Sequence, residues 1–156
     1  MSICFLNGEY LEIQDAKISP LDRGFLFGDS IYEVIIAVNK RPFELESHLK
    51  RLNKNLSTLK YSLSNRTDLE EIILEVISRN KFFNQVIYLQ ISRGTDIIRD
   101  HIPGNNLSPT IFVSSHELQT DFSPSSGEKA ILLEDFRWRK SQIKATSLLA
   151  NVLYRS

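Results

Sequence analysis

The sequence predicts an α+β domain in which β-strands and two helices share one hydrophobic core. Runs rich in β-branched residues occur before and after a central helical region. Within that region, leucines and isoleucines recur at steps of three and four, the spacing of an amphipathic helix. Turn-forming residues separate these runs. A chain of 156 residues is long enough to bury a sizeable core of this kind.

The first strands are predicted from short apolar runs and the turns between them. Residues 3–6 and 10–11 form a predicted strand pair around Asn7-Gly8, a dipeptide typical of tight hairpin turns. In residues 22–29, two glycines bracket two phenylalanines, which indicates an irregular loop with a fixed path. Residues 31–38 are rich in β-branched side chains and predict the next strand, which Asn39-Lys40-Arg41 would end in a hairpin turn.

Two amphipathic helices are predicted to follow. The first begins at Glu44, and its apolar stripe consists of Leu45, Leu49, Leu52, Leu56, Leu59 and Leu63. Thr67 to Glu70 matches a capping box that would begin the second helix. The apolar face of that helix consists of Leu69, Ile72, Ile73, Val76 and Ile77. Residues 86–92 and 110–115 then predict two more strands, with a long loop over 94–109.

The remaining chain predicts a boundary between two domains. Residues 121–127, Asp-Phe-Ser-Pro-Ser-Ser-Gly, have the composition of a linker. We therefore expect a first domain over 1–120 and the incomplete start of a second domain over 128–156, beginning with a strand from Lys129 to Glu134. We expect this 156-residue chain to be inactive on its own.

Composition excludes several classes of function. Lys and Arg total 19 and Asp and Glu total 19, so a net charge of zero argues against nucleic acid or an anionic membrane as partner. No run approaches the roughly 18 apolar residues of a membrane span, and the start lacks the features of a signal peptide. With Cys4 as the only cysteine, neither a disulfide nor a multi-cysteine metal site is possible. We expect a cytoplasmic protein without a bound metal.

A few cationic residues are candidates for chemistry. Lys144 follows a cluster of cations and precedes a mostly apolar run, and such surroundings favour the neutral amine that forms a Schiff base with an aldehyde. Arg51, beside the leucine stripe, could bind a phosphate with two hydrogen bonds, and Arg99 and His101 in the long loop could bind a carboxylate. From spacing alone, the commoner interpretation is that Lys144 is a surface lysine and that Arg51 is a solvated helix arginine.

Four motifs, in order and at matching separations, resemble class IV aminotransferases, which are pyridoxal-phosphate enzymes of fold type IV. Residues 22–34 resemble the N-terminal signature, and His48-Leu49-Lys50-Arg51-Leu52 resembles the family's H-x-x-R-L element. Residues 88–95 are similar to the strand that ends in Arg-Gly. Residues 134–138, Ile143-Lys144 and the run 148–153 resemble the approach to the cofactor lysine and the helix after it.

The resemblance implies a fold, a cofactor and a set of site residues. The fold would be the N-terminal small domain of a fold type IV enzyme, an antiparallel sheet with two helices, followed by the truncated start of the cofactor-binding domain. The cofactor would be pyridoxal 5'-phosphate, with Lys144 as the Schiff-base lysine and proton carrier. Arg51 would bind the phosphate. Arg137 would lie near the phosphate or the lysine, and Tyr32 would line the pocket.

Within the family, the pair Arg99 and His101 resembles that of bacterial D-amino-acid aminotransferases. There, together with the tyrosine matching Tyr32, the pair binds the substrate carboxylate across the interface of a homodimer. The implied reaction is transamination between an amino acid, of D configuration and similar to D-alanine, and a 2-oxo acid.

Three departures from the family pattern keep alternatives open. The loop is one residue longer before Arg99, Ala145 and Ser147 replace residues usual in the family, and the chain ends soon after Lys144. A branched-chain aminotransferase and an aminodeoxychorismate lyase share the scaffold. A non-catalytic truncated fragment is the alternative of another class.

Overall fold

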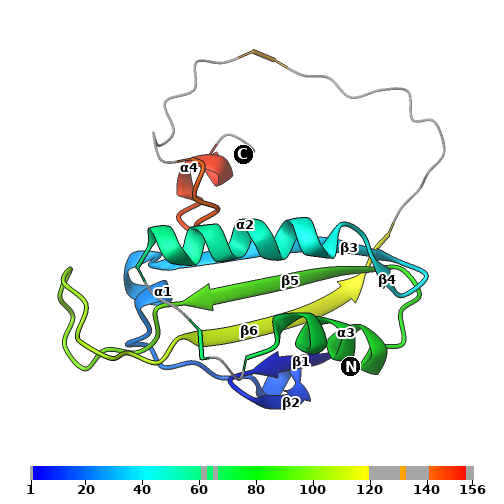
Figure 1. Ribbon diagram of the computed structural model, residues 1–156, viewed down its shortest axis with the longest axis horizontal. Helices are drawn as coiled ribbons and strands as arrows, with labels where there is room; N and C mark the ends of the chain where they lie inside the picture. The colour runs from blue at the N-terminus through cyan, green and yellow to red at the C-terminus, as the bar shows by residue number, and fades with distance from the viewer. Residues whose placement is uncertain (1, 61–62, 65–66, 120–130, 133–140, 154–156) are drawn as a thin grey trace.

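The computed structural model describes residues 2–60, 63–64, 67–119, 131–132 and 141–153. Its centre is a six-stranded antiparallel sheet with the order β2-β1-β6-β5-β3-β4 (Figure 1). The strands are β1 (Ile3–Leu6), β2 (Glu9–Glu12), β3 (Ser30–Val38), β4 (Arg41–Pro42), β5 (Gln85–Ser92) and β6 (Thr110–Glu117). This architecture confirms the predicted α+β class.

The tight turns lie where the sequence predicts them. Asn7 and Gly8 both have positive φ, 50° and 104°, and join β1 to β2. Asn39 and Lys40 also have positive φ, and they join β3 to β4. Two consecutive residues of positive φ match the right-handed twist of the flanking strands, which is why asparagine and glycine favour such turns.

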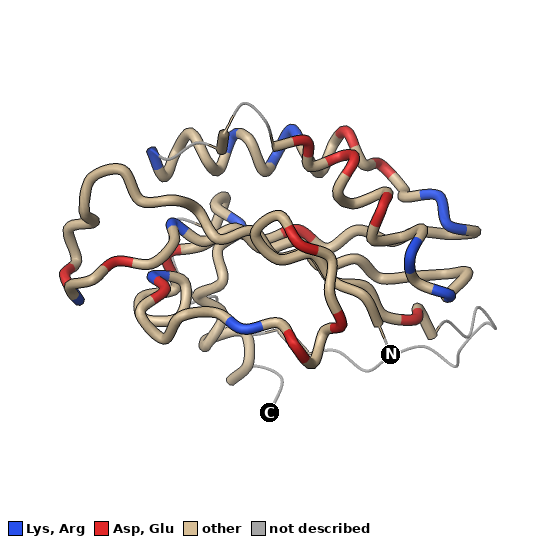
Figure 2. The backbone as a smooth tube through the Cα atoms, turned by 90° about the horizontal axis from the view of Figure 1, so that it is seen from below, with Lys and Arg blue, Asp and Glu red and all other residues tan. Residues whose placement is uncertain are grey.

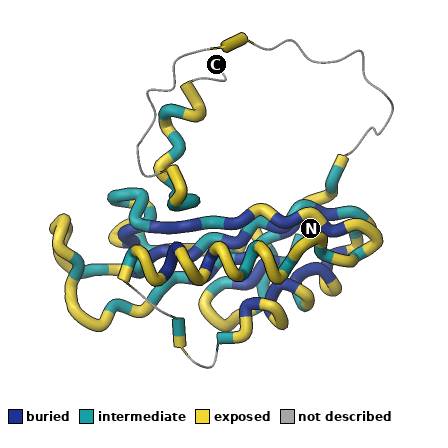
Figure 3. The backbone as a smooth tube through the Cα atoms, turned by 45° about the horizontal axis from the view of Figure 1, so that its top comes forward, coloured by how far each residue is buried: buried dark blue, intermediate teal, exposed yellow. Residues whose placement is uncertain are grey.

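Two long helices, α2 (Leu45–Thr58) and α3 (Leu69–Arg79), pack against one face of the sheet (Figures 1 and 3). All five residues of the predicted apolar face of α3 are buried. In α2 the leucine stripe is shorter than predicted, because the helix ends at Thr58 and Leu63 lies beyond it. The sheet contributes alternate residues to this core, including Ile31, Ile35, Ile87, Leu89 and Ile91.

Two local predictions were wrong in detail. The segment expected as an irregular loop contains a short helix, α1 (Arg23–Phe27), which Asp22 caps by accepting a hydrogen bond from the Gly24 amide. Five residues are too few to show a helical period in the sequence. The N-cap of α3 is Asp68 rather than Thr67, since its carboxylate accepts from the Glu71 amide.

The C-terminal segment returns to the sheet. Its short helix α4 (Leu149–Leu153) follows residues 141–148, which lie beside β3. The predicted linker, residues 121–127, and all but two residues of the strand expected over 129–134 lie outside the described residues.

Charges of both signs are interspersed along the described backbone (Figure 2). Among the described helices, none combines the length and the apolar character needed to cross a membrane.

Candidate functional site

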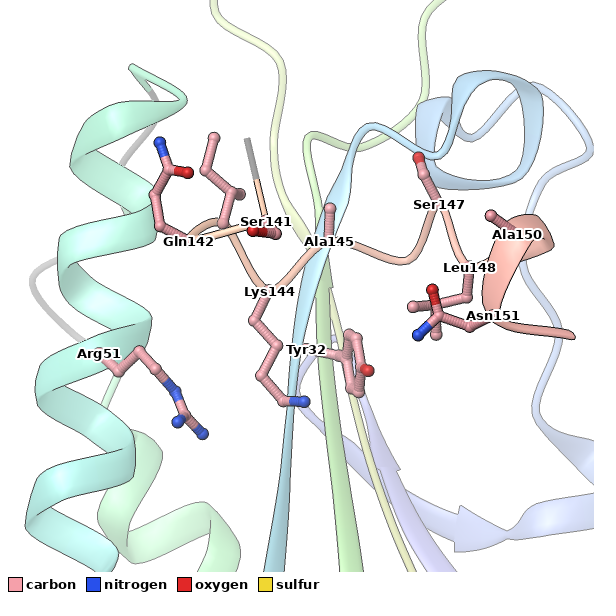
Figure 4. A pocket seen from close by; sticks show the side chains of 11 residues that line it. Tyr32, Arg51, Ser141, Gln142, Lys144, Ala145, Ser147, Leu148, Ala150 and Asn151 are labelled. Atoms are coloured by element: carbon pink, nitrogen blue, oxygen red, sulfur yellow. The ribbon is translucent and has the colours of Figure 1, made fainter. Parts of the chain in front are cut away.

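A cavity of about 390 Å³ lies between α2, the edge of β3 and the segment that leads into α4 (Figure 4). Lys144 and Arg51 reach into it from opposite sides, and Tyr32 lies next to the lysine. The other lining residues are Ser141, Gln142, Ile143, Ala145, Ser147, Leu148, Ala150 and Asn151. The structure thus brings together three of the six site residues predicted from the sequence.

Backbone hydrogen bonds hold the Lys144 segment against β3. The Tyr32 amide donates to the Lys144 carbonyl at 2.9 Å, and the Thr146 amide donates to the Ser30 carbonyl at 3.1 Å. Between them, Ile31 and Ala145 form an antiparallel bridge, and the hydroxyls of Ser30 and Thr146 are hydrogen-bonded to each other. The position of Lys144 is therefore set by main-chain pairing with the strand that carries Tyr32.

Gly28 makes room for this segment. Its φ of 64° lies in the left-handed region, where it ends α1. A Cβ atom at this position would lie 2.5 Å from the Ser147 hydroxyl oxygen, so any side chain would displace Ser147. Glycine is needed here both for the backbone conformation and for the close approach of the cavity wall.

The Lys144 ammonium lies over the ring of Tyr32, with Nζ 3.9 Å from the ring centroid. A cation over the face of an aromatic ring is attracted by its negative π surface. This contact places the amine beside the Tyr32 ring, in the cavity that Arg51 also lines.

Arg51 is paired with a buried carboxylate, Glu33, that carries no functional assignment from the sequence. Arg51 Nε donates to Glu33 Oε1 at 2.7 Å, and Arg51 Nη2 donates to Oε2. His48 Nδ1 donates to the same Oε2 at 2.8 Å. Burial alone would raise the pKa of the Glu33 carboxyl, but the hydrogen bonds and charges of Arg51 and His48 outweigh it and lower that pKa below its ordinary value.

The remaining substrate candidates, Arg99 and His101, do not line this cavity. Both side chains pack on Phe27, with the Arg99 guanidinium 4.9 Å and the His101 ring 5.5 Å from its ring centroid. Arg23 fixes the loop backbone, because Nη1 donates to the Asp100 carbonyl at 2.7 Å and Nη2 to the His101 carbonyl at 3.0 Å. The loop is therefore held at the end of the sheet near α1.

A second ion-pair cluster, partly buried, supports this loop. Asp29 accepts from Arg23 Nε at 3.0 Å, and from Arg93 Nε and Nη2 at 2.7 and 3.1 Å. Arg93 also donates to the Leu59 carbonyl at 3.0 Å, which ties in the end of α2. Burial would raise the pKa of the Asp29 carboxyl, yet the two arginines lower it below its ordinary value.

One predicted site residue, Arg137, lies outside the described residues. Among the described residues, no three histidine, cysteine or carboxylate side chains are grouped as a metal site would require. The residues that sequence reasoning missed are Glu33, His48 and Arg23. A signal existed for Glu33, since alternation along β3 places it on the same face as the buried Ile31 and Ile35.

Comparison with known proteins gives a consistent family. Residues 30–156 match the amino-transferase class IV family. D-alanine aminotransferase of Staphylococcus haemolyticus is 33% identical over 156 residues, which cover 98% of this chain and 55% of that protein. The chain therefore spans about half the length of the curated relatives it matches.

Solved structures agree with this match. A branched-chain aminotransferase of Thermoproteus uzoniensis, solved with norvaline, has a TM-score of 0.77 at 19% identity, over 98% of this chain and 54% of that chain. A T.th. branched-chain amino acid aminotransferase, solved with pyridoxamine 5'-phosphate, has a TM-score of 0.71 at 25% identity, over 79% and 42%. The Thermoproteus uzoniensis structure shows that this chain shares its fold. With its residues 30–156 matched, the chain belongs to the class IV aminotransferases.

Proposed function

We propose that this chain carries part of the active site of a pyridoxal-phosphate-dependent aminotransferase that acts on a D-amino acid similar to D-alanine and a 2-oxo acid. The observation that carries the proposal is the meeting of Lys144 and Arg51 in one cavity beside Tyr32. The family uses pyridoxal phosphate. The relatives that are similar to this chain in sequence, from Staphylococcus haemolyticus and Bacillus licheniformis, are D-alanine aminotransferases.

The cavity fits the chemical demands of this cofactor. An aldehyde needs an amine, which Lys144 supplies, and a phosphate needs cationic donors, which the Arg51 guanidinium supplies. A volume of about 390 Å³ lies within the usual range for small-ligand sites. Pyridoxamine 5'-phosphate, the amine form of this cofactor, is bound in the T.th. branched-chain aminotransferase.

Each residue then has a distinct task. When bound, the cofactor supplies an electron sink for the Cα–H bond of the substrate. Lys144 Nζ would hold the cofactor and, once freed by the substrate amine, take up the proton from substrate Cα and deliver a proton to the cofactor. Arg51 would bind the phosphate, and Arg137 would lie near the phosphate or the lysine. Tyr32 would line the substrate side and orient the Lys144 amine through the ring contact.

The carboxylate site is proposed to come from a second subunit. Arg99 and His101 lie on a braced loop away from the cavity of their own chain. In a homodimer, this loop would reach the cavity of the other subunit and bind the substrate carboxylate. The contact is with substrate alone, so it would select the amino acid without holding the cofactor.

Kinetic comparison of amino acids tests the function. Completed to the length of its relatives, the protein should form pyruvate from D-alanine and 2-oxoglutarate faster than it transaminates L-leucine, whereas the 156-residue chain alone should be inactive. In Arg99→Ala, kcat/KM for D-alanine should fall by about tenfold to a hundredfold, the loss expected for one charge-assisted hydrogen bond, while cofactor affinity stays unchanged.

The alternatives give different outcomes in the same assay. Preference for L-leucine would assign a branched-chain aminotransferase and contradict the D-amino-acid proposal. Pyruvate released from aminodeoxychorismate without a 2-oxo acid would assign the lyase activity.

A further inference from the structure

A buried carboxylate lies behind the proposed phosphate-binding arginine. Glu33 is fully buried on the face of β3 that packs against the helices, where its neighbours on the same face are Ile31 and Ile35. Burying an ionised carboxylate is unfavourable unless hydrogen bonds and opposite charges compensate it. Its partners on α2, Arg51 and His48, supply that compensation.

The pairing uses one particular edge of the guanidinium. Arg51 binds Glu33 through Nε and Nη2, which lie side by side on one edge of the planar group. A carboxylate oxygen only accepts hydrogen bonds, so His48 Nδ1 must carry the proton in its 2.8 Å contact with Glu33. That nitrogen then cannot accept from Arg51 Nη2, which lies 3.3 Å from it.

The other edge of the Arg51 guanidinium is not used in this pairing. Within the part of the chain that the structure describes, Arg51 Nη1 has no hydrogen-bond partner. The side chain is 48% exposed and lines the same cavity as Lys144 (Figure 4). One edge of the guanidinium is therefore fixed from the protein interior, and Nη1 is left to bind an anion in the cavity.

We infer that Glu33 is a positioning residue, which holds Arg51 so that its Nη1 edge presents hydrogen-bond donors to a phosphate monoester in the cavity. His48 acts with it by fixing the second carboxylate oxygen. This inference rests on the proposed function, because it takes Arg51 as the phosphate ligand.

In the opposite interpretation, Glu33 competes with the phosphate for Arg51. An anion beside an arginine weakens the attraction of that arginine for a second anion, and by charge alone its removal should tighten phosphate binding. If Glu33 positions Arg51, its removal should weaken binding, because a long side chain without support must lose its rotamer freedom when it binds. The two readings therefore predict effects of opposite sign.

Nitrogen NMR of the unmodified protein is the first test. The Arg51 Nε–Hε signal, assigned by its loss in Arg51→Lys, is followed while inorganic phosphate is added. Positioning by Glu33 predicts that this signal keeps its hydrogen-bonded chemical shift while the Arg51 Nη signals respond. Movement of the Nε signal to the position of exposed arginines, or no response of Arg51 at all, would overturn the inference.

Substitution of Glu33 is the second test, with pyridoxal phosphate and inorganic phosphate as the probes. Glu33→Gln keeps the shape and removes the charge, and Glu33→Asp keeps the charge and shortens the reach. Both should weaken binding of both probes by roughly tenfold, the order of the rotamer freedom that Arg51 would then lose on binding. Unchanged binding by a folded Glu33→Gln protein, as shown by its circular dichroism, would overturn the positioning role, and tighter binding would make Glu33 a competitor.

Two controls separate this inference from the proposed function. Glu75→Gln removes the same charge from an exposed pair with Arg79 on α3, and should leave binding of both probes unchanged. Lys144→Ala should abolish attachment of pyridoxal phosphate yet preserve the NMR response of Arg51 to inorganic phosphate. If pyridoxal phosphate never attaches to Lys144 while that response persists, the cofactor proposal fails and the role of Glu33 toward a phosphate stands.

Discussion

Two carboxylates at the start of β3, Asp29 and Glu33, use the same ion-pair chemistry for different ends. Each accepts the side-on pair of hydrogen bonds of an arginine, from Arg93 and Arg51 respectively. They differ in what the arginine does with its other donors. Arg93 and Arg23, which share Asp29, also donate to the backbone carbonyls of Leu59, Asp100 and His101.

The exposed fractions of the arginine side chains also differ between the two clusters. The side chains of Arg23 and Arg93 are 4% and 16% exposed, whereas that of Arg51 is 48% exposed and borders a cavity. An arginine whose remaining donors bind the backbone joins segments of the fold. One whose remaining donors face a cavity can bind a ligand. The comparison therefore predicts a role in stability for the Asp29 cluster and a role in binding for the Glu33 cluster.

The largest effect should come from breaking the Asp29 cluster. Asp29→Ala leaves two arginines without their carboxylate, and one of them, Arg23, is buried. Removal of one partner from a buried pair typically costs about 3–5 kcal/mol. Urea unfolding should show a loss of this size in the free energy of unfolding. A loss below about 1 kcal/mol, the worth of an exposed pair, would contradict the structural role.

Substitution of Arg51 should lower stability less than substitution of Asp29, and its main effect should be on cofactor binding. Arg51→Ala should weaken pyridoxal-phosphate binding by about tenfold or more, because a charge-assisted contact is lost. It should also lower the free energy of unfolding by about 1–3 kcal/mol, since Glu33 stays buried with His48 as its remaining partner.

The double variant Arg51→Ala with Glu33→Gln isolates the cause of that instability. Removal of the stranded charge should restore most of the lost stability, as measured by urea unfolding, while phosphate affinity stays low. If stability does not recover, the loss comes from another contact of Arg51 and the comparison needs revision.

The smallest effect concerns pH. The folded-state pKa values of Asp29 and Glu33 both lie below their ordinary values of 3.8 and 4.5. Above those ordinary values the two groups contribute their full stability. As pH falls below them, the unfolded chain takes up protons that the folded chain does not, and stability is lost through the lower folded pKa values. Urea unfolding from pH 7 to pH 3 should show this decline, and Glu33→Gln should reduce its slope. An unchanged slope in that variant would contradict the account.

Much of the fold could be predicted from the sequence, because its elements have strong local periods. Runs rich in β-branched and apolar residues predicted β3, β5 and β6, and steps of three and four predicted α2 and the whole buried face of α3. The short helix α1 has no such period, and its stability comes from the Asp22 and Gly28 caps.

The site was less predictable, because its contacts join residues that are distant in sequence. The resemblance to class IV aminotransferases indicated Lys144, Arg51 and Tyr32, and these lie around one cavity. Their roles in binding and catalysis remain predictions. The pairing of Arg51 with Glu33, 18 residues apart, depends on the packing of α2 on β3. The hydrogen bonds of Arg23 to a loop 77 and 78 residues away have no local pattern at all.

The attachment site of the cofactor tests the central claim most directly. Pyridoxal phosphate is added to the protein completed with its second domain, fixed by borohydride reduction, and located by mass spectrometry of the proteolytic peptides. The position of Lys144 beside Tyr32, opposite Arg51, predicts that the modified residue is Lys144 and that Lys144→Ala carries no label. A stoichiometric label on Lys140 or Lys129 in place of Lys144 would contradict it.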